Sequence, residues 1–140
     1  MGYQQQVLGT YRKQQVETAT PGQLIVMLYD AGIRNCKAAQ EAIERKDRDA
    51  SARHLLKAQD IVAELMSSLN VEAGGELGAK LLRLYEYMYR RLVHANVRKD
   101  AQAAKEVESL LAGLRDAWAQ AAAATPAPAQ PAGAGTGPTA

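Results

Sequence analysis

Thr-Pro-Gly-Gln-Leu-Ile-Val-Met-Leu-Tyr, residues 20–29, is the stretch that decides the fold. Thr20 stands three residues before Gln23, which is the spacing of a capping box, and Pro21 occupies the first helical position, where proline is favoured. Large apolar side chains follow from Leu24 onward. The stretch therefore predicts that a long helix begins at Pro21.

Beyond this start the apolar side chains recur with the period of helices, and no alternating run predicts a strand. Asp47 or Asp49 can cap a second helix, residues 70–75 read as a turn, and Asp100 can cap a fourth helix. The first predicted helix covers about residues 21–45, and the second runs from its aspartate cap to about residue 69. The third covers about residues 76–97 and the fourth about residues 101–123. Because short connections make successive helices antiparallel neighbours, the predicted fold is all-α, an antiparallel up-down-up-down four-helix bundle.

The two ends of the chain differ in composition from this bundle domain, which we assign to residues 20–124. Residues 1–19 are polar with scattered apolar side chains and cannot form a core alone. They fit either a frayed, flexible or short helical segment, or a removable cover over a binding surface of the bundle. Residues 125–140 contain only Ala, Pro, Gly, Thr and Gln, which is typical of a disordered tail.

Composition restricts the classes of partner. The net charge of +2 is too small to favour nucleic acid, and 47% hydrophobic with 23% charged residues is ordinary for a soluble globular chain. The longest apolar run, Leu24–Tyr29, is far shorter than the roughly 20 residues of a membrane span. No secretory signal opens the chain, so the sequence predicts a cytoplasmic protein without membrane insertion.

Side chains that carry chemistry are scattered. His54 and His94 fall on different helices without a glutamate three residues before either, and Cys36 is the only cysteine. Gly74 and Gly75 lack the Gly-Lys-Ser/Thr that completes a phosphate loop. We therefore expect no catalytic residues, no metal, no cofactor and no enzymatic activity, and interpret Cys36 as a small apolar core side chain.

The first and third predicted helices have apolar stripes wider than a single core line. One interpretation is that a bundle helix touches two neighbours, so that the whole stripe is core. The other is an exposed apolar surface that binds a segment of another chain. The candidate partner-binding side chains are Val26, Tyr29, Ile33, Leu82, Tyr85, Tyr89 and Val93.

The third helix contains three of the six tyrosines within five residues. At about 100° per residue, Tyr85 and Tyr89 share one side while Tyr87 points roughly the opposite way. Met88 falls on the core line. We therefore rank Tyr89 and Val93 above Tyr87 as anchors for a partner.

Basic side chains gather toward the end of the same helix, at Arg90, Arg91, Arg98 and Lys99. They are interpreted either as a solvated face that complements the helix dipole or as a docking site for an acidic partner. The second interpretation gives an alternative function, a regulatory helical-bundle adaptor that binds an acidic protein.

Three segments, residues 18–32, 57–62 and 84–96, together closely resemble the flagellar secretion chaperone (FliS) family. The resemblance extends over about residues 11–119, with the segments in the family's order and spacing. Each segment is weak evidence alone, whereas the combination is specific. The Ala/Pro/Gly tail has no counterpart in the family pattern.

This resemblance implies a chaperone without ATPase activity that binds the C-terminal region of newly made flagellin, prevents premature polymerisation and helps deliver it to the flagellar type III secretion apparatus. It implies contact with a component of the flagellar export gate. It also implies that the N-terminal segment covers part of the binding surface in the free protein, through Val7, Leu8 and Tyr11. Self-association through the same surface stays open.

Overall fold

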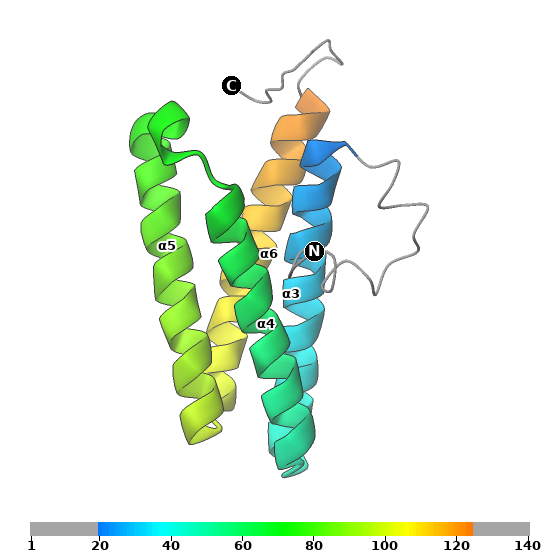
Figure 1. Ribbon diagram of the computed structural model, residues 1–140. Coiled ribbons are helices and arrows are strands. Elements are labelled where there is room, and N and C mark those ends of the chain that lie inside the picture. Colours follow the sequence, from blue (N-terminus) through cyan, green and yellow to red (C-terminus); the bar gives the residue numbers. More distant parts are fainter. Residues whose placement is uncertain (1–19, 125–140) are drawn as a thin grey trace.

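The computed structural model describes residues 20–124, and these form four helices without a strand (Figure 1). In chain order the helices are α3 (Pro21–Glu44), α4 (Arg48–Ser68), α5 (Val71–Arg98) and α6 (Ala101–Ala124). The predicted all-α class is confirmed, and each helix lies close to its predicted range. The predictions for residues 1–19, including Val7, Leu8 and Tyr11, and for residues 125–140 lie outside the described residues.

Side-chain caps set the helix starts. The Thr20 amide donates to Gln23 Oε1 at 2.8 Å and the Gln23 amide donates to Thr20 Oγ1 at 3.1 Å, which completes the predicted capping box. Asp47, rather than Asp49, caps α4 by accepting from the Ala50 amide at 3.1 Å. Local sequence thus fixes where the antiparallel helices begin.

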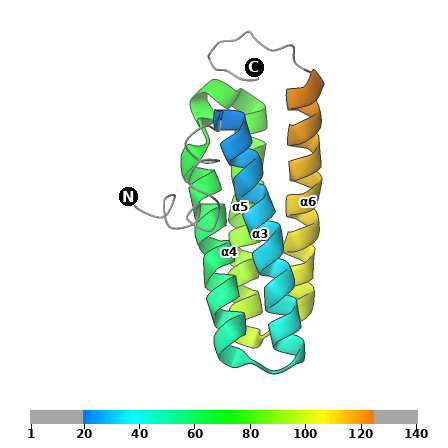
Figure 2. The same cartoon turned by 90° about the vertical axis from the view of Figure 1, so that its right-hand side faces the viewer.

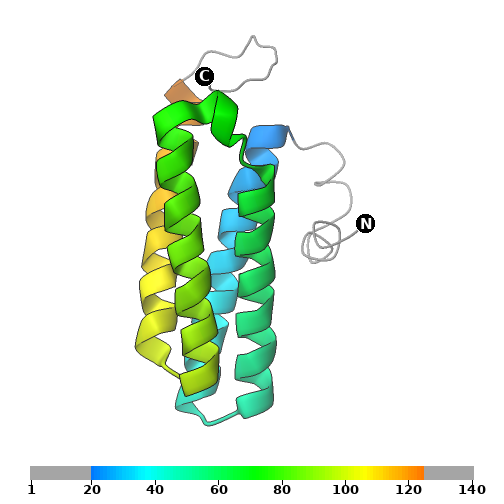
Figure 3. The ribbon, with the colours of Figure 1, turned by 60° about the vertical axis from the view of Figure 1, so that its left-hand side comes forward.

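Each helix packs against two neighbours, in the cyclic order α3, α4, α5, α6. Figures 2 and 3 show the four roughly parallel axes and the alternating chain direction. The contact between α5 and α6 is the least extensive of the four. In Figure 1 the first part of α5 and the last part of α6 diverge, so the bundle is closed at one end of this pair and spread at the other.

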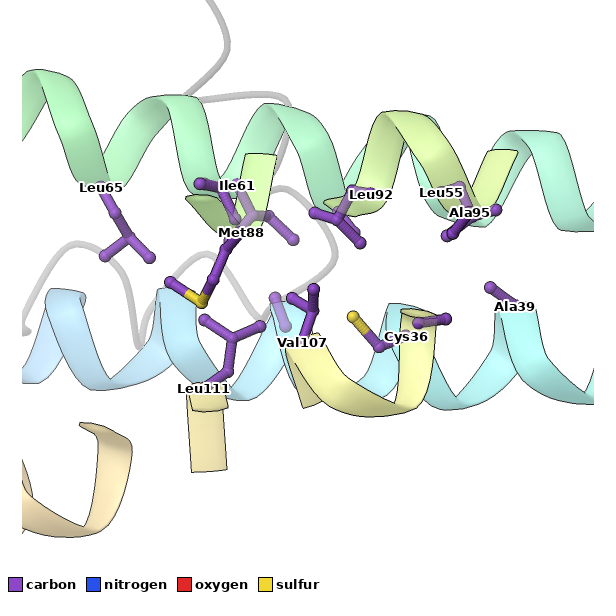
Figure 4. Packing of buried hydrophobic residues seen from close by; sticks show 14 of the residues in the cluster. Cys36, Ala39, Leu55, Ile61, Leu65, Met88, Leu92, Ala95, Val107 and Leu111 are labelled. Carbon is purple, nitrogen blue, oxygen red and sulfur yellow. The ribbon is translucent and has the colours of Figure 1, made fainter. Parts of the chain in front are cut away.

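The core is aliphatic and lies along the bundle axis. Figure 4 shows Leu55, Met88, Leu92 and Leu111 converging from α4, α5 and α6, and all are fully buried. The Cys36 thiol is buried with them, and burial raises its pKa to about 12, so it stays protonated as a small apolar side chain. Met88 and Cys36, which the sequence predicted to lie in the core, are both buried there.

Gly32 permits the closest approach within the core. A Cβ at this position would lie 2.9 Å from Leu111 Cδ1 and 3.4 Å from Ile61 Cγ2. Because real side chains do not tolerate the shorter distance, the glycine allows α6 to pack tightly on α3. The α3–α6 pair is thereby held close while α5 and α6 spread.

The start of α5 differs from its prediction. Residues 71–74 were expected to form a turn, but they form a first helical turn capped by Asn70, whose side chain accepts from the Ala73 amide at 3.1 Å. Gly75 then kinks the helix, with φ 60° and ψ −135°. Only glycine adopts this conformation readily, so Gly75 redirects the chain into the long part of α5.

Substituting Gly75 with alanine should lower the free energy of unfolding by about 1 to 3 kcal/mol, because the Cβ is disfavoured at this φ and ψ. Gly74 provides the matched control. It has a regular helical backbone with open space around it, so Gly74→Ala should be neutral or stabilise by up to about 1 kcal/mol. Urea unfolding of both variants checks the pair, and equal effects would contradict the role given to Gly75.

Candidate functional site

Two of the predicted surface tyrosines lie in the core. Tyr29 and Tyr85 are only 1% and 4% exposed, and their hydroxyl oxygens are 2.6 Å apart in a hydrogen bond between α3 and α5. Burial raises the pKa of both phenols. The expectation that they face a partner in the free chain is wrong, because each hydroxyl gives the other a polar partner inside the bundle and so permits burial.

The other predicted side chains of α3 lie on one flank. Val26 and Ile33 are half-buried, on the side of α3 that faces α6. The same flank contains Asp30, which accepts from Arg115 Nε at 2.9 Å, and Gln40, which donates to Glu108 at 2.7 Å. Val26 and Ile33 thus border the α3–α6 contact.

The predicted side chains of α5 lie elsewhere. Tyr87 and Arg91 both donate to Glu106, which marks the flank of α5 that faces α6. Leu82, Tyr89 and Val93 fall on the opposite flank, toward α4. The structure therefore separates them from Val26 and Ile33 and does not form the single patch that the sequence suggested.

The basic cluster is also divided. Arg91 Nε lies 2.9 Å from Glu106 Oε1, so this guanidinium stabilises the α5–α6 contact, and Lys99 Nζ donates to Asn96 at 2.9 Å. Arg90 and Arg98 are exposed and form no ion pair within residues 20–121. Two of the four predicted cations therefore already have partners within the chain, and docking of an acidic partner at this cluster stays a prediction.

Glu106 gives the α5–α6 contact an acid-sensitive component. The Tyr87 hydroxyl, with Arg91, holds the pKa of the Glu106 carboxyl below its usual value. Because the pKa of Glu106 is lower in the folded state, its ionised carboxylate stabilises the fold at pH values above about 4.3, the pKa of glutamate in an unfolded chain. This stabilisation is lost as the pH falls through the lower pKa of the folded state. As the pH falls from about 5 to about 3, the free energy of unfolding of Glu106→Gln should decrease less than that of the unmodified chain. Acid titrations followed by circular dichroism measure this decrease. An equal decrease in both proteins would contradict the role given to Glu106.

The strongest candidate for a binding surface lies where α5 and α6 diverge. Leu77, Leu81 and Leu84 share the helix face of Met88, yet Leu77 is 68% exposed and the other two are only half-buried. From α6, half-buried apolar side chains on its core-facing stripe belong to the same part of the bundle. We call this set the α5–α6 surface, and it consists of Leu77, Leu81, Leu84, Leu110, Leu114 and Trp118.

All six side chains continue the core-facing apolar stripes of their helices. They are incompletely covered because the two helices are held together at one end only. His94 Nε2 lies 3.0 Å from Asp100 Oδ2 at the α5–α6 turn, and the Glu106 contacts follow one to two turns later. Beyond them the ribbons of α5 and α6 separate (Figure 1), and Leu77, on this part of α5, is largely exposed.

Trp118 borders this surface on the α3 side. A Cβ added to Gly22 would lie 3.7 Å from the indole nitrogen, so the ring packs beside the first turn of α3. The ring is half-buried and also contacts the main core. As the only tryptophan of the chain, it is a built-in spectroscopic reporter for this region.

The chemistry of the α5–α6 surface is that of binding. Its six members are apolar and contribute no acid, base or nucleophile. Among the residues that the structure describes, no group of three His, Cys, Asp or Glu side chains could hold a metal ion, and no helix is long and apolar enough to cross a membrane. An apolar segment of another chain is the kind of ligand that such a surface fits.

Comparison with known proteins identifies relatives over most of the chain. Residues 3–125 match the family described as flagellar protein FliS. The flagellar secretion chaperone FliS of Bacillus subtilis is 43% identical over 111 residues, which cover 79% of this chain and 82% of the relative. The flagellar secretion chaperone FliS of Salmonella typhimurium is 43% identical over 106 residues, which cover 75% of this chain and 78% of the relative. The flagellar secretion chaperone FliSB of Pseudomonas aeruginosa is 38% identical over 104 residues, which cover 74% of this chain and 82% of the relative.

Proposed function

Because the chain belongs to the FliS family of flagellar secretion chaperones, we propose that it binds the C-terminal region of a flagellin in the cytoplasm. Binding keeps this region from polymerising prematurely and holds it for delivery to the flagellar type III secretion apparatus. Family membership supports the export-chaperone role, and the apolar α5–α6 surface supports a client that is bound rather than chemically changed.

The observation that carries the proposal is the unfinished core between α5 and α6. Leu77, Leu81 and Leu84 share the helix face of Met88, yet Met88 is fully buried whereas Leu77 is largely exposed and the other two are half-buried. An amphipathic segment of the client completes this part of the bundle, as an additional helix would. The surfaces through which the client would polymerise are apolar in this account, so binding to the α5–α6 surface buries them as well.

The free energy gained by burying apolar surface must exceed the cost of ordering the client segment. Each square ångström of apolar surface removed from water contributes about 25 cal/mol, so covering the exposed parts of six large side chains supplies several kcal/mol. Ordering a segment that is disordered when free costs about 2 to 5 kcal/mol. The balance favours moderate affinity, which suits a client that must later be released for export.

The client's path beyond this surface is also a proposal. Val26 and Ile33 border the α3–α6 contact and remain predicted contacts for a client that wraps around α6. Tyr29 and Tyr85 are removed from the predicted contact set because the core encloses them. Leu82, Tyr89 and Val93 stand on the far flank of α5 from the α5–α6 surface, so a client centred on that surface need not reach them.

Calorimetry with a peptide covering the C-terminal region of flagellin tests the proposal. We expect a one-to-one complex with a Kd tighter than about 100 μM, which corresponds to about 5.5 kcal/mol. A scrambled peptide of the same composition is the control. Absence of heat together with a Kd weaker than this limit at several temperatures would count against the proposed function.

A further inference from the structure

A buried glutamine without a hydrogen-bond partner lies between α4 and α5. Gln59 is only 8% exposed, and its carboxamide forms no hydrogen bond within residues 20–124. Buried polar side chains are nearly always hydrogen-bonded, because burial otherwise removes their contacts with water without replacing them. A carboxamide carries a donor NH2 and an acceptor oxygen side by side. Gln59 is therefore equipped to bind a group that the described part of the chain does not supply.

Gln59 lies on the side of α4 that faces α5. His54 Nδ1 is 2.9 Å from Asn35 Oδ1 of α3, which marks the α3-facing side of α4. Gln59 is five residues later, about 140° further round, and the fully buried Leu55 and Val62 lie between the two directions. Because the core closes the inner side, the exposed remainder of Gln59 opens outward, at the edge where α4 meets α5.

The position of Gln59 along the bundle places it beside one segment of α5. Figure 4 shows Leu55 of α4 and Ala95 of α5 at the same position along the bundle. The two helices are antiparallel, so four residues further along α4 correspond to about four residues earlier in α5. Gln59 therefore stands level with the segment between Tyr89 and Val93.

Three apolar side chains border Gln59 on this edge. Leu56, one turn before it, and Val93 are exposed to 52% and 38%, and Tyr89 is half-buried. Arg91 faces Glu106 of α6, so Tyr89 and Val93 lie on the other flank of α5 from the α5–α6 surface. One ligand can therefore occupy each flank at the same time. We call the set on this edge the α4–α5 surface, and it consists of Leu56, Gln59, Tyr89 and Val93.

Charges of both signs surround the α4–α5 surface. Arg53 and Asp60 stand one turn before and one turn after Leu56, and Glu86 and Arg90 belong to the neighbouring turns of α5. Two charges of each sign leave no net charge at its edge. Apolar burial and hydrogen bonding, rather than charge, must therefore select what binds there.

We propose that the α4–α5 surface binds an extended apolar segment of a second protein other than the export client, and that Gln59 binds the main chain of this segment. The N–H and C=O of one extended residue point to the same side, where they match the oxygen and the NH2 of the carboxamide. Within a helix these main-chain groups bond to each other, so a helical segment cannot offer them. Apolar side chains of the extended segment cover Leu56 and Val93.

Two short labelled peptides test the proposal. One alternates valine with threonine, which favours an extended chain, and the other has the same sequence with the nitrogens of its central residues methylated. Methylation keeps the side chains but removes the main-chain donors. Fluorescence anisotropy with the full-length chain should give at least about tenfold tighter binding of the unmethylated peptide, with little dependence on salt. Equal affinity for the two peptides would overturn the proposal.

Gln59→Met tests whether the carboxamide is responsible. Methionine has a similar length but no donor, so the variant should bind the unmethylated peptide at least about tenfold more weakly and should no longer distinguish the two peptides. Its urea midpoint should equal or exceed that of the unmodified chain, because an unpartnered buried polar group is removed. A lower midpoint would mean that the carboxamide already has a partner in the free protein. That result, or unchanged peptide affinity, would overturn the proposal.

Two exposed leucines locate the bound peptide. Leu56→Asp should weaken the binding of the unmethylated peptide at least about tenfold, because the new carboxylate would be covered by apolar side chains. Leu77→Asp, on the α5–α6 surface, should leave this binding unchanged. Circular dichroism checks that both variants are folded. Equal affinities of the two folded variants would overturn the proposal.

Other occupants of the α4–α5 surface give different results. If a second copy of this chain covers it, sedimentation will show a dimer that Gln59→Met dissociates. If flagellin covers it, Gln59→Met will weaken the binding of the flagellin peptide. If residues 1–19 cover it, replacing Val7 and Leu8 with aspartate in the full-length chain will tighten the binding of the unmethylated peptide. Each of these results would overturn the proposal, whereas failure of the unmodified chain to bind flagellin would affect only the proposed function.

Discussion

Replacing Leu77 with aspartate should weaken the binding of a flagellin C-terminal peptide by at least about tenfold, or 1.4 kcal/mol. The side chain is largely exposed in the free protein, so the substitution removes little from the fold. In the complex the new carboxylate would be buried in an apolar interface without a partner, which costs several kcal/mol. Calorimetry and urea unfolding of the same preparation separate the two effects.

Val97→Asp is the matched control for this variant. Val97 is on the same helix and is exposed to a similar extent, but it lies near the other end of α5, away from the α5–α6 surface. It should bind the flagellin peptide as the unmodified chain does. Equal losses in the two variants would show that the client is not centred on the α5–α6 surface.

Replacing Tyr29 with alanine should lower the free energy of unfolding by about 3 to 5 kcal/mol, as for other buried aromatic side chains. The substitution leaves a cavity among α3, α5 and the aliphatic core. It also removes the hydrogen-bond partner of Tyr85, whose hydroxyl oxygen is 2.6 Å away. Urea unfolding measures the loss, and a change below about 1 kcal/mol would mean that Tyr29 is a surface side chain after all.

Phenylalanine variants separate packing from hydrogen bonding. Tyr29→Phe keeps the ring but leaves the Tyr85 hydroxyl buried without its partner, at a cost of about 1 to 3 kcal/mol. Replacing both tyrosines with phenylalanine removes the unpaired group, so the double variant should lose less than the sum of the single variants. Additive losses would show that the hydroxyl pair does not couple α3 to α5.

Local rules predicted the helices well. The Thr20–Gln23 capping box, the aspartate before α4 and the apolar period each act within a few residues, and the structure places helix boundaries close to where they indicated. The exception is the first turn of α5. There, Asn70 and the permissive Gly75 allow a short helical turn and a kink, which composition alone does not distinguish from an open turn.

Exposure was predicted less well, because periodicity gives the direction of a side chain but not whether another helix covers it. Leu77, Leu84 and Leu114 continue the apolar stripes of their helices, yet they are partly exposed where α5 diverges from α6. Tyr29 and Tyr85 sit at the edge of the stripe, where a polar hydroxyl suggested water. Their burial depends on a contact 56 residues apart in the chain, which no local pattern reveals.

The fluorescence of Trp118 provides the most direct test of the central claim, that the client completes the core at the α5–α6 surface. The chain contains one tryptophan, half-buried at the edge of this surface, so a tryptophan-free flagellin C-terminal peptide leaves it as the only indole in solution. The account predicts a saturable blue shift on binding. A scrambled peptide of the same composition should not produce this shift, and Leu77→Asp should reach it only at about tenfold higher peptide concentration. Binding of the flagellin peptide, verified by calorimetry, with no change in Trp118 emission would contradict it.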